Sequence, residues 1–133
     1  MQVQAVSFGY KNRLKTAWKN GEIPQLQHDF YDGSLLKKET VTLEHLLPHS
    51  KGGKTTLTNL VLTNYSNNIK RGNRDIRDYI NIMAAKQYLD EAKKIKCKGI
   101  NGENYAKSII NRLKSLGVKL WTLSNKLKLQ KNS

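Results

Sequence analysis

Apolar residues recur three or four positions apart in some segments of the chain and alternate with polar residues in others. Leu14, Ala17 and Trp18 share one face of a helix, and Gly21 lies where that helix would end. The run TVTLEHLL alternates as a strand does, until Pro48 interrupts it. The pattern predicts a helix over 10–20, an irregular segment over 25–39, a strand over 40–47, a loop over 49–58, a strand over 59–63 and a helix within 64–72.

Helical spacing dominates the second half of the chain. The stripe that predicts a helix over 74–97 comprises Ile76, Tyr79, Ile80, Met83, Ala84 and Tyr88. Gly99 and the Asn101-Gly102 turn are expected to close that helix. A second stripe predicts a helix over 103–116, and the pattern over 118–130 fits either a strand or a helix.

These elements predict an α+β fold, in which a small ββα core of two short antiparallel strands and a helix is flanked by N- and C-terminal helices. The length of 133 residues suits a single domain over 1–133. We expect the ββα core at about 40–75 and a basic helical C-terminal region at about 76–133. Cys97 is the one cysteine, which excludes an intramolecular disulfide and a cysteine-only zinc site.

The charge of the chain predicts a polyanionic partner. Lysine and arginine number 24 against 10 aspartate and glutamate, a formal charge of +14, and residues 93–133 hold eleven basic residues against the single acid Glu103. Such an excess favours nucleic acid over a membrane surface. No apolar run approaches the ~20 residues of a membrane span, and 1–9 lacks the pattern of a secretory signal. We expect a soluble, cytoplasmic protein that binds nucleic acid.

Candidate chemistry gathers in the nearly neutral middle of the chain. Glu44 and His45 are adjacent where the first predicted strand ends, Asn59 opens the return strand, and Asn68 follows on the next helix. An imidazole titrates near neutral pH and can accept a proton from water. A carboxylate and an amide oxygen suit a hard cation such as Mg²⁺.

The stretch TVTLEHLLPHSKGGKTTLTNLVLTNYSNNIKRGNR resembles the ββα-metal motif of the HNH endonucleases. That family's core reads as an acid-His pair, a proline, a Gly-Gly loop, Asn-Leu-Val-Leu and a Cys-x-x-Cys-Asn-x-x-Lys-Gly helix. The elements that match in order are Glu44-His45, Pro48, Gly52-Gly53, Asn59-Leu60-Val61-Leu62 and Asn68. The resemblance covers about 29–75, roughly a third of the chain.

The resemblance implies a Mg²⁺- or Mn²⁺-dependent endonuclease acting on DNA, preferentially double-stranded, by nicking or cleaving both strands. His45 would be the general base, Glu44 and Asn68 would bind the metal, and Asn59 would orient His45 across the loop. The residues expected to bind phosphates are Lys70, Arg71 and Arg74, together with Lys51 and Lys54. His49 fits either a solvated loop position or a contact with the phosphate or metal. Cleavage would leave 5′-phosphate and 3′-hydroxyl ends.

The sequence departs from the family at the positions of two cysteine pairs. Asp29 and Asp32 replace the first pair, and Asn64 and Asn67 replace the second. Carboxylates and amides suit harder ions or plain hydrogen bonds, so no structural zinc is expected and local packing or capping must hold the motif. Glu44 also stands where the family more often has aspartate, and glutamate remains a good Mg²⁺ ligand.

Two other functions remain open at this stage. One is a non-catalytic nucleic-acid-binding module on the same scaffold, and the other is an RNA nuclease, because the phosphate chemistry does not distinguish the sugars. A homodimer is also compatible with the sequence. Trp18 and Trp121 can stack on bases, although burial in a helix-packed core is the favoured interpretation.

Overall fold

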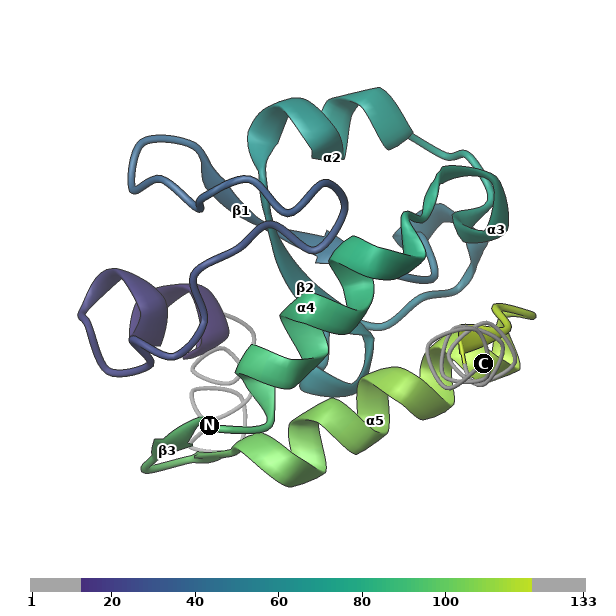
Figure 1. The fold of residues 1–133 in the computed structure, drawn as a ribbon. Helices are drawn as coiled ribbons and strands as arrows, with labels where there is room; N and C mark the ends of the chain where they lie inside the picture. The colour runs from purple at the N-terminus through teal and green to yellow at the C-terminus, as the bar shows by residue number, and fades with distance from the viewer. Residues whose placement is uncertain (1–12, 121–133) are drawn as a thin grey trace, which may run out of the picture.

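The computed structural model describes residues 13–120 (Figure 1). Residues 13–19 are helical and are followed by an irregular segment that reaches the first strand. The remaining elements are β1 (Val41–His45), the 3-10 turns η1 (His49–Lys51) and η2 (Leu57–Asn59), β2 (Leu60–Asn64), α2 (Tyr65–Arg71), α3 (Ile76–Tyr79), α4 (Ile82–Ala92), β3 (Lys96–Cys97), β4 (Ile100–Asn101) and α5 (Gly102–Ser115).

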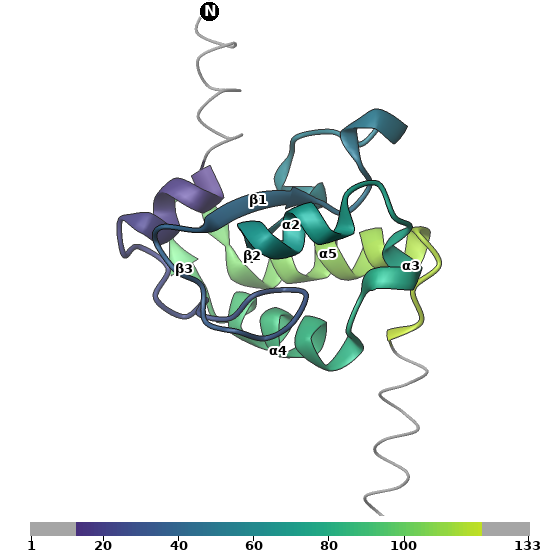
Figure 2. The ribbon, with the colours of Figure 1, turned by 90° about the horizontal axis from the view of Figure 1, so that it is seen from above.

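The fold is α+β, and its centre is the expected ββα arrangement. β1 and β2 pair antiparallel, with Glu44 opposite Val61 and His45 opposite Leu60. β2 runs without a loop into α2, because Asn64 ends the strand in an extended conformation and precedes the first helical residue. In Figure 1 the hairpin lies between α2 on one side and α5 on the other, and in the view from above in Figure 2 α2 lies over the hairpin.

Two buried tyrosines anchor the hairpin to the helices beneath it. The Tyr88 hydroxyl on α4 accepts a hydrogen bond from the Leu62 amide at 3.0 Å, and the Tyr105 hydroxyl on α5 donates to the Leu60 carbonyl at 2.7 Å. The two hydroxyls are 2.8 Å apart. Because β2 is buried along its whole length, backbone groups that do not face β1 need such partners. The tyrosines therefore fix β2, and with it the start of α2, against the core.

The predicted helix over 74–97 is wrong as a single element, because it divides into α3, α4 and β3. The Asn81 side chain accepts a hydrogen bond from the Ala84 amide at 3.1 Å and caps a new helix at that point. Met83, assigned to the apolar stripe, is 62% exposed. Asn101 caps the start of α5 rather than closing the preceding helix, and the turn between β3 and β4 is made by Gly99 at φ 91°.

The structure tests the prediction for Trp18 but not the predictions for Trp121 and the C-terminal segment. Trp18 packs against the core, and its indole N–H donates to the Leu26 carbonyl at 2.8 Å, as the favoured interpretation expects. Trp121 and most of 118–130 lie outside the described residues. Across residues 13–120, no helix has both the length and the apolar character that a membrane crossing requires.

Candidate functional site

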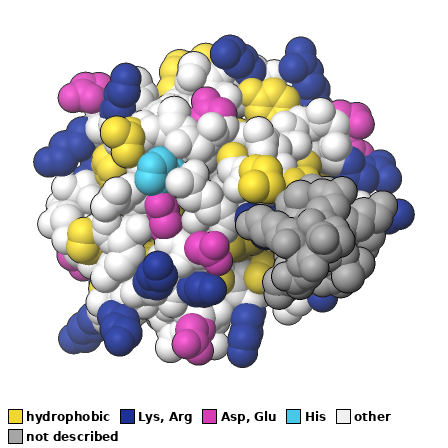
Figure 3. Space-filling model, in the orientation of Figure 1, with side chains coloured by type: hydrophobic (Ala, Val, Ile, Leu, Met, Phe, Trp, Pro, Cys, Tyr) yellow, Lys and Arg dark blue, Asp and Glu magenta, His cyan; other side chains and the backbone are white. Residues whose placement is uncertain are grey.

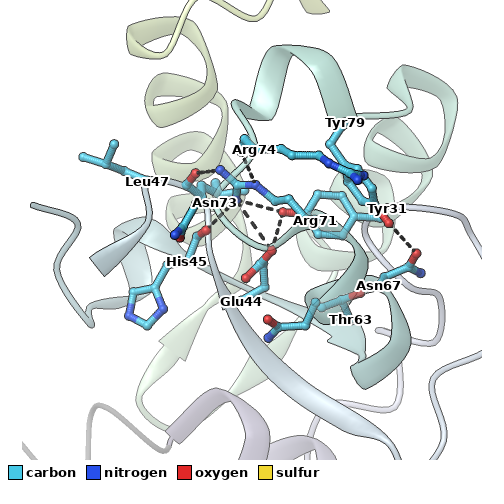
Figure 4. Close-up of polar contacts among 12 residues, drawn as sticks. Tyr31, Glu44, His45, Leu47, Thr63, Asn67, Arg71, Asn73, Arg74 and Tyr79 are labelled. Carbon is cyan, nitrogen blue, oxygen red and sulfur yellow. Dashed lines mark hydrogen bonds and ion pairs between the residues drawn. The ribbon is translucent and has the colours of Figure 1, made fainter. Parts of the chain in front are cut away.

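The candidate site lies where β1 ends, beside the loop that leads to β2 and beside α2. Glu44 and His45 are the last two residues of β1, and Asn59 is the last residue of η2, directly before β2. Asn68 lies one turn into α2. Successive strand residues face opposite sides, and in Figure 4 the His45 ring points away from the Glu44 carboxylate. The two groups therefore approach any common ligand from different sides.

Glu44 is held in a buried cluster with Tyr31 and Arg71. The Tyr31 hydroxyl donates to Glu44 Oε2 at 2.7 Å, and Arg71 Nη1 lies 3.6 Å from the same oxygen. Only 6% of Glu44 is exposed. Burial raises the pKa of Glu44, while the hydrogen bond from Tyr31 and the charge of Arg71 act in the opposite direction. The sequence indicated neither contact: Tyr31 was not among the candidate residues, and Arg71 was expected to bind a phosphate.

Arg71 is the largest fully buried side chain in the described part of the chain. Its guanidinium donates to the His45 carbonyl at 2.7 Å, to the Leu46 carbonyl at 2.8 Å, and through Nε to the Arg74 carbonyl at 2.9 Å. It also donates to the Tyr31 hydroxyl at 3.0 Å. Arg71 therefore ties the end of α2 to the end of β1 (Figure 4). The prediction that it binds a phosphate at the surface is corrected: at 1% exposure its donors serve the interior.

His45 is half-buried and is held by a loop hydroxyl. Its Nε2 lies 2.9 Å from Thr55 Oγ1, and its ring centroid lies 6.1 Å from that of His49. Burial, and then the charge of His49, lower the pKa of His45, so its neutral form is favoured at neutral pH. If Nε2–H donates to Thr55, the lone pair on Nδ1 is available to accept a proton. Thr55 was missed because nothing in the sequence distinguishes it from its neighbour Thr56.

Asn59 fastens both ends of the loop that follows β1. Its Oδ1 accepts from the Leu47 amide at 2.9 Å, and its Nδ2 donates to the carbonyls of Leu47 and Lys54, both at 3.0 Å. The side chain is fully buried. No hydrogen bond joins it to the His45 ring among the described residues. Its predicted orienting role is thus indirect, because it fixes the loop that carries Thr55.

Asn68 lies beside the peptide that precedes Glu44. Its Nδ2 donates to the Leu43 carbonyl at 3.1 Å, which fixes the amide against β1 and turns Oδ1 away from that carbonyl. An amide oxygen and a carboxylate are donors that suit Mg²⁺ or Mn²⁺. Residues 13–120 contain no cluster of three or more His, Cys, Asp or Glu side chains arranged for a metal. A cation here would be held by Glu44 and Asn68 and otherwise by water and phosphate, as Mg²⁺ prefers.

Asp29, Asp32, Asn64 and Asn67 form a hydrogen-bonded network. The buried Asp29 carboxylate accepts from the Asn64 amide N–H at 2.6 Å and from Asn67 Nδ2 at 3.0 Å. Asn67 Nδ2 also donates to Asp32 at 2.8 Å. The Asp29 carboxylate accepts from the Tyr31 amide at 2.7 Å as well. The four residues therefore meet, and hydrogen bonds join the 29–32 loop to β2 and α2.

The basic residues predicted to bind phosphates lie around this site on the surface, apart from Arg71. Lys51, Lys54, Lys70 and Arg74 are exposed, and His49 is exposed beside them in η1. Lys51 Nζ donates to the Asn73 carbonyl at 3.1 Å, which links the loop to the turn after α2. Figure 3 shows Lys and Arg side chains spread around one face of the molecule rather than gathered in one patch.

Alanine substitution of the two loop glycines should separate a close backbone contact from simple strain. A Cβ on Gly53 would lie 1.7 Å from the Leu47 carbonyl oxygen, whereas Gly52 has φ 92° and open space around it. Gly53→Ala should cost about 2 to 3 kcal/mol of unfolding free energy, since the loop backbone must move. Gly52→Ala, the matched control, should cost about 1 kcal/mol. Urea denaturation measures both, and equal losses would contradict the contact.

The sequence was compared with protein-family models and with curated proteins. No protein-family model matches the sequence, and no curated protein matches it significantly.

Proposed function

We propose that the chain is a divalent-metal-dependent endonuclease that hydrolyses phosphodiester bonds in DNA. The observation that carries the proposal is the hydrogen bond from Asn68 to the Leu43 carbonyl. It holds the Asn68 side chain against the peptide that precedes Glu44, and His45 is the next residue of the same strand end. The proposal keeps the cytoplasmic location expected from the sequence.

A Mg²⁺ or Mn²⁺ ion held by Glu44 and Asn68 would supply Lewis-acid stabilisation of the charge that develops on the phosphate and the leaving oxygen. His45 Nδ1 takes the proton from a water molecule as the water oxygen attacks phosphorus. The bond from phosphorus to the 3′ oxygen breaks, and that oxygen is protonated by solvent. The products are a 5′-phosphate and a 3′-hydroxyl.

The residues around these groups hold them ready for the reaction. Thr55 fixes the His45 ring, and Asn59 fixes the loop that carries Thr55. Arg71 donates to the carbonyls of His45 and Leu46, which holds the strand end against α2. The exposed Lys51, Lys54, Lys70 and Arg74 would bind neighbouring phosphates, which positions the strand without reading its sequence.

Removal of divalent cations should abolish cleavage of supercoiled plasmid. EDTA-treated protein should be inactive and should recover with Mg²⁺ or Mn²⁺. Asn68→Ala should lower the rate by at least about 100-fold, the upper range for loss of an outer-shell partner, whereas Asn68→Asp should retain metal-dependent activity. Asn73→Ala, which removes an exposed amide from the turn after α2, is the matched control. Cleavage that persists in EDTA would overturn the metal-dependent mechanism.

A non-catalytic nucleic-acid-binding module is the second candidate function. One observation favours it: Glu44 Oε2 already faces the Tyr31 hydroxyl and the Arg71 guanidinium, a complete structural role for a buried carboxylate. Binding of DNA without cleavage in Mg²⁺ and in Mn²⁺ would support this candidate. Matched RNA and DNA substrates in the same assay separate an RNA nuclease from a DNA nuclease.

A further inference from the structure

A groove beside α2 combines exposed apolar side chains with lysines, and we call it the Tyr65 groove. It has a volume of about 860 Å³. The residues that line it are Ser34, Leu35, Lys37, Thr40, Asn64, Tyr65, Ser66, Ile69 and Lys70. Leu35, Tyr65 and Ile69 are each 58–59% exposed. The only other large apolar side chain so exposed among residues 13–120 is Met83. Such a concentration of exposed apolar surface is typical of an interaction site.

The charges at the groove are of one sign. Lys37 and Lys70 both line it, and no carboxylate does so among the described residues. Both lysines are exposed. A second copy of the chain placed there by a two-fold axis would bring these lysines toward each other. An anionic ligand with a flat apolar part fits the groove better than a second copy does. Its charge would pair with the lysines, and its flat part would cover the tyrosine ring.

The groove and the candidate site lie on neighbouring faces of one short helix. Tyr65 and Ile69 are four residues apart and share the outer face of α2, and Asn68 is displaced from both by less than a third of a turn. Lys70 follows Asn68 by two positions. A strand that crosses α2 can therefore place one phosphate near Asn68 and a neighbouring nucleotide over Tyr65.

We propose that the Tyr65 groove binds an unpaired base of a nucleic acid strand, stacked on the Tyr65 ring, with the flanking phosphates on Lys37 and Lys70. This inference rests on the nucleic-acid substrate of the proposed function and adds a base-binding subsite to it. Aromatic side chains beside a basic track are how proteins hold single strands without reading a sequence. The subsite would favour substrates that expose bases next to the cleaved bond, such as single strands, flaps and gaps.

The test measures binding of the full chain to a single-stranded oligonucleotide in EDTA, where cleavage is excluded. A fluorescent base analogue in the strand reports stacking directly. Tyr65→Ala should weaken binding about tenfold and abolish the quenching of the analogue, whereas Tyr65→Phe should stay within about twofold of wild type. Met83→Ala, an equally exposed apolar truncation on α4, should leave both signals unchanged. Duplex of the same sequence should bind Tyr65→Ala and wild type alike.

The outcomes separate this inference from the nuclease proposal. Unchanged single-strand binding by Tyr65→Ala would overturn the base site, and so would an equal loss on duplex DNA. A wild-type dimer in sedimentation that Tyr65→Ala converts to a monomer would also overturn it, because a second copy would then occupy the groove. If Tyr65→Ala loses binding but wild type never cleaves, the base site stands and the nuclease proposal fails.

Discussion

Alanine at position 45 is expected to lower the rate of metal-dependent cleavage by roughly 10²- to 10⁴-fold, the range that general-base catalysis contributes. The expectation follows from the state of the imidazole. Burial and the nearby charge of His49 lower the pKa of His45, so the ring is neutral and able to accept a proton at neutral pH. Thr55 holds one ring nitrogen at 2.9 Å and leaves the other for water.

Initial rates of plasmid nicking measure this effect, and DNA binding in EDTA shows whether His45→Ala still engages the substrate. Thr55→Val keeps the imidazole and removes the hydroxyl that holds it, so its loss should be smaller than that of His45→Ala. His28→Ala is the matched histidine control. His28 Nδ1 lies 2.5 Å from Glu91 Oε2, and neither residue belongs to the loop after β1. It should alter stability rather than the rate per folded molecule. Full activity of His45→Ala would reject the site.

The parts of the site that lie close together in sequence were the parts that the sequence could predict. β1, β2 and α2 follow one another in the sequence, and Glu44, His45 and Asn68 all belong to this ββα unit. Local alternation and turn residues fix such elements. The other contacts of the site join residues that lie far apart in the sequence. Tyr31 reaches Glu44 and Arg71 across 13 and 40 residues, and no local pattern reports those contacts.

Arg71 shows how a basic residue can mislead. Its position in a run of basic residues indicated the surface, yet it lies three to four residues beyond Asn67 and Asn68. Asn67 and Arg71 are four residues apart on one inward face of α2, and both are buried. The helical spacing indicated that Arg71 is buried, whereas the basic residues beside it in the sequence suggested that it is exposed. The phosphate-binding prediction therefore stays with the exposed Lys70 and Arg74.

Substitution of Tyr31, Glu44 or Arg71 is expected to destabilise the fold as well as change the proposed site. Removing one partner of a buried charge pair leaves the other uncompensated, so Glu44 is tied to the fold as well as to the proposed metal. Tyr31 in turn depends on Asp29, which accepts from its backbone amide at 2.7 Å. The hydrogen-bonded network around Asp29 and the carboxylate of Glu44 are thus one connected polar unit, joined through Tyr31.

Replacement of Asp29 by alanine should destabilise the protein by about 4 kcal/mol or more. The carboxylate is fully buried and accepts from the Tyr31 and Asn64 backbone amides, from the Thr63 hydroxyl at 2.7 Å and from the Asn67 side chain. Each buried donor left without an acceptor costs about 1–3 kcal/mol. Urea denaturation, followed by tyrosine and tryptophan fluorescence, measures the loss, and Asp29→Asn should be less severe because one acceptor oxygen remains.

Asp32→Ala is the matched control within the same network. Asp32 is exposed; burial acts to raise its pKa, but hydrogen bonds from Asn67 and Ser34 outweigh that and lower it. Loss of the Asp32 carboxylate leaves Asn67 with Asp29 as its acceptor and leaves Ser34 in contact with water, so the cost should be about 1 kcal/mol or less. Equal destabilisation by the two substitutions would show that the network does not depend on the buried carboxylate. A large loss confined to Asp29→Ala would show that one buried aspartate is the centre of this hydrogen-bonded network.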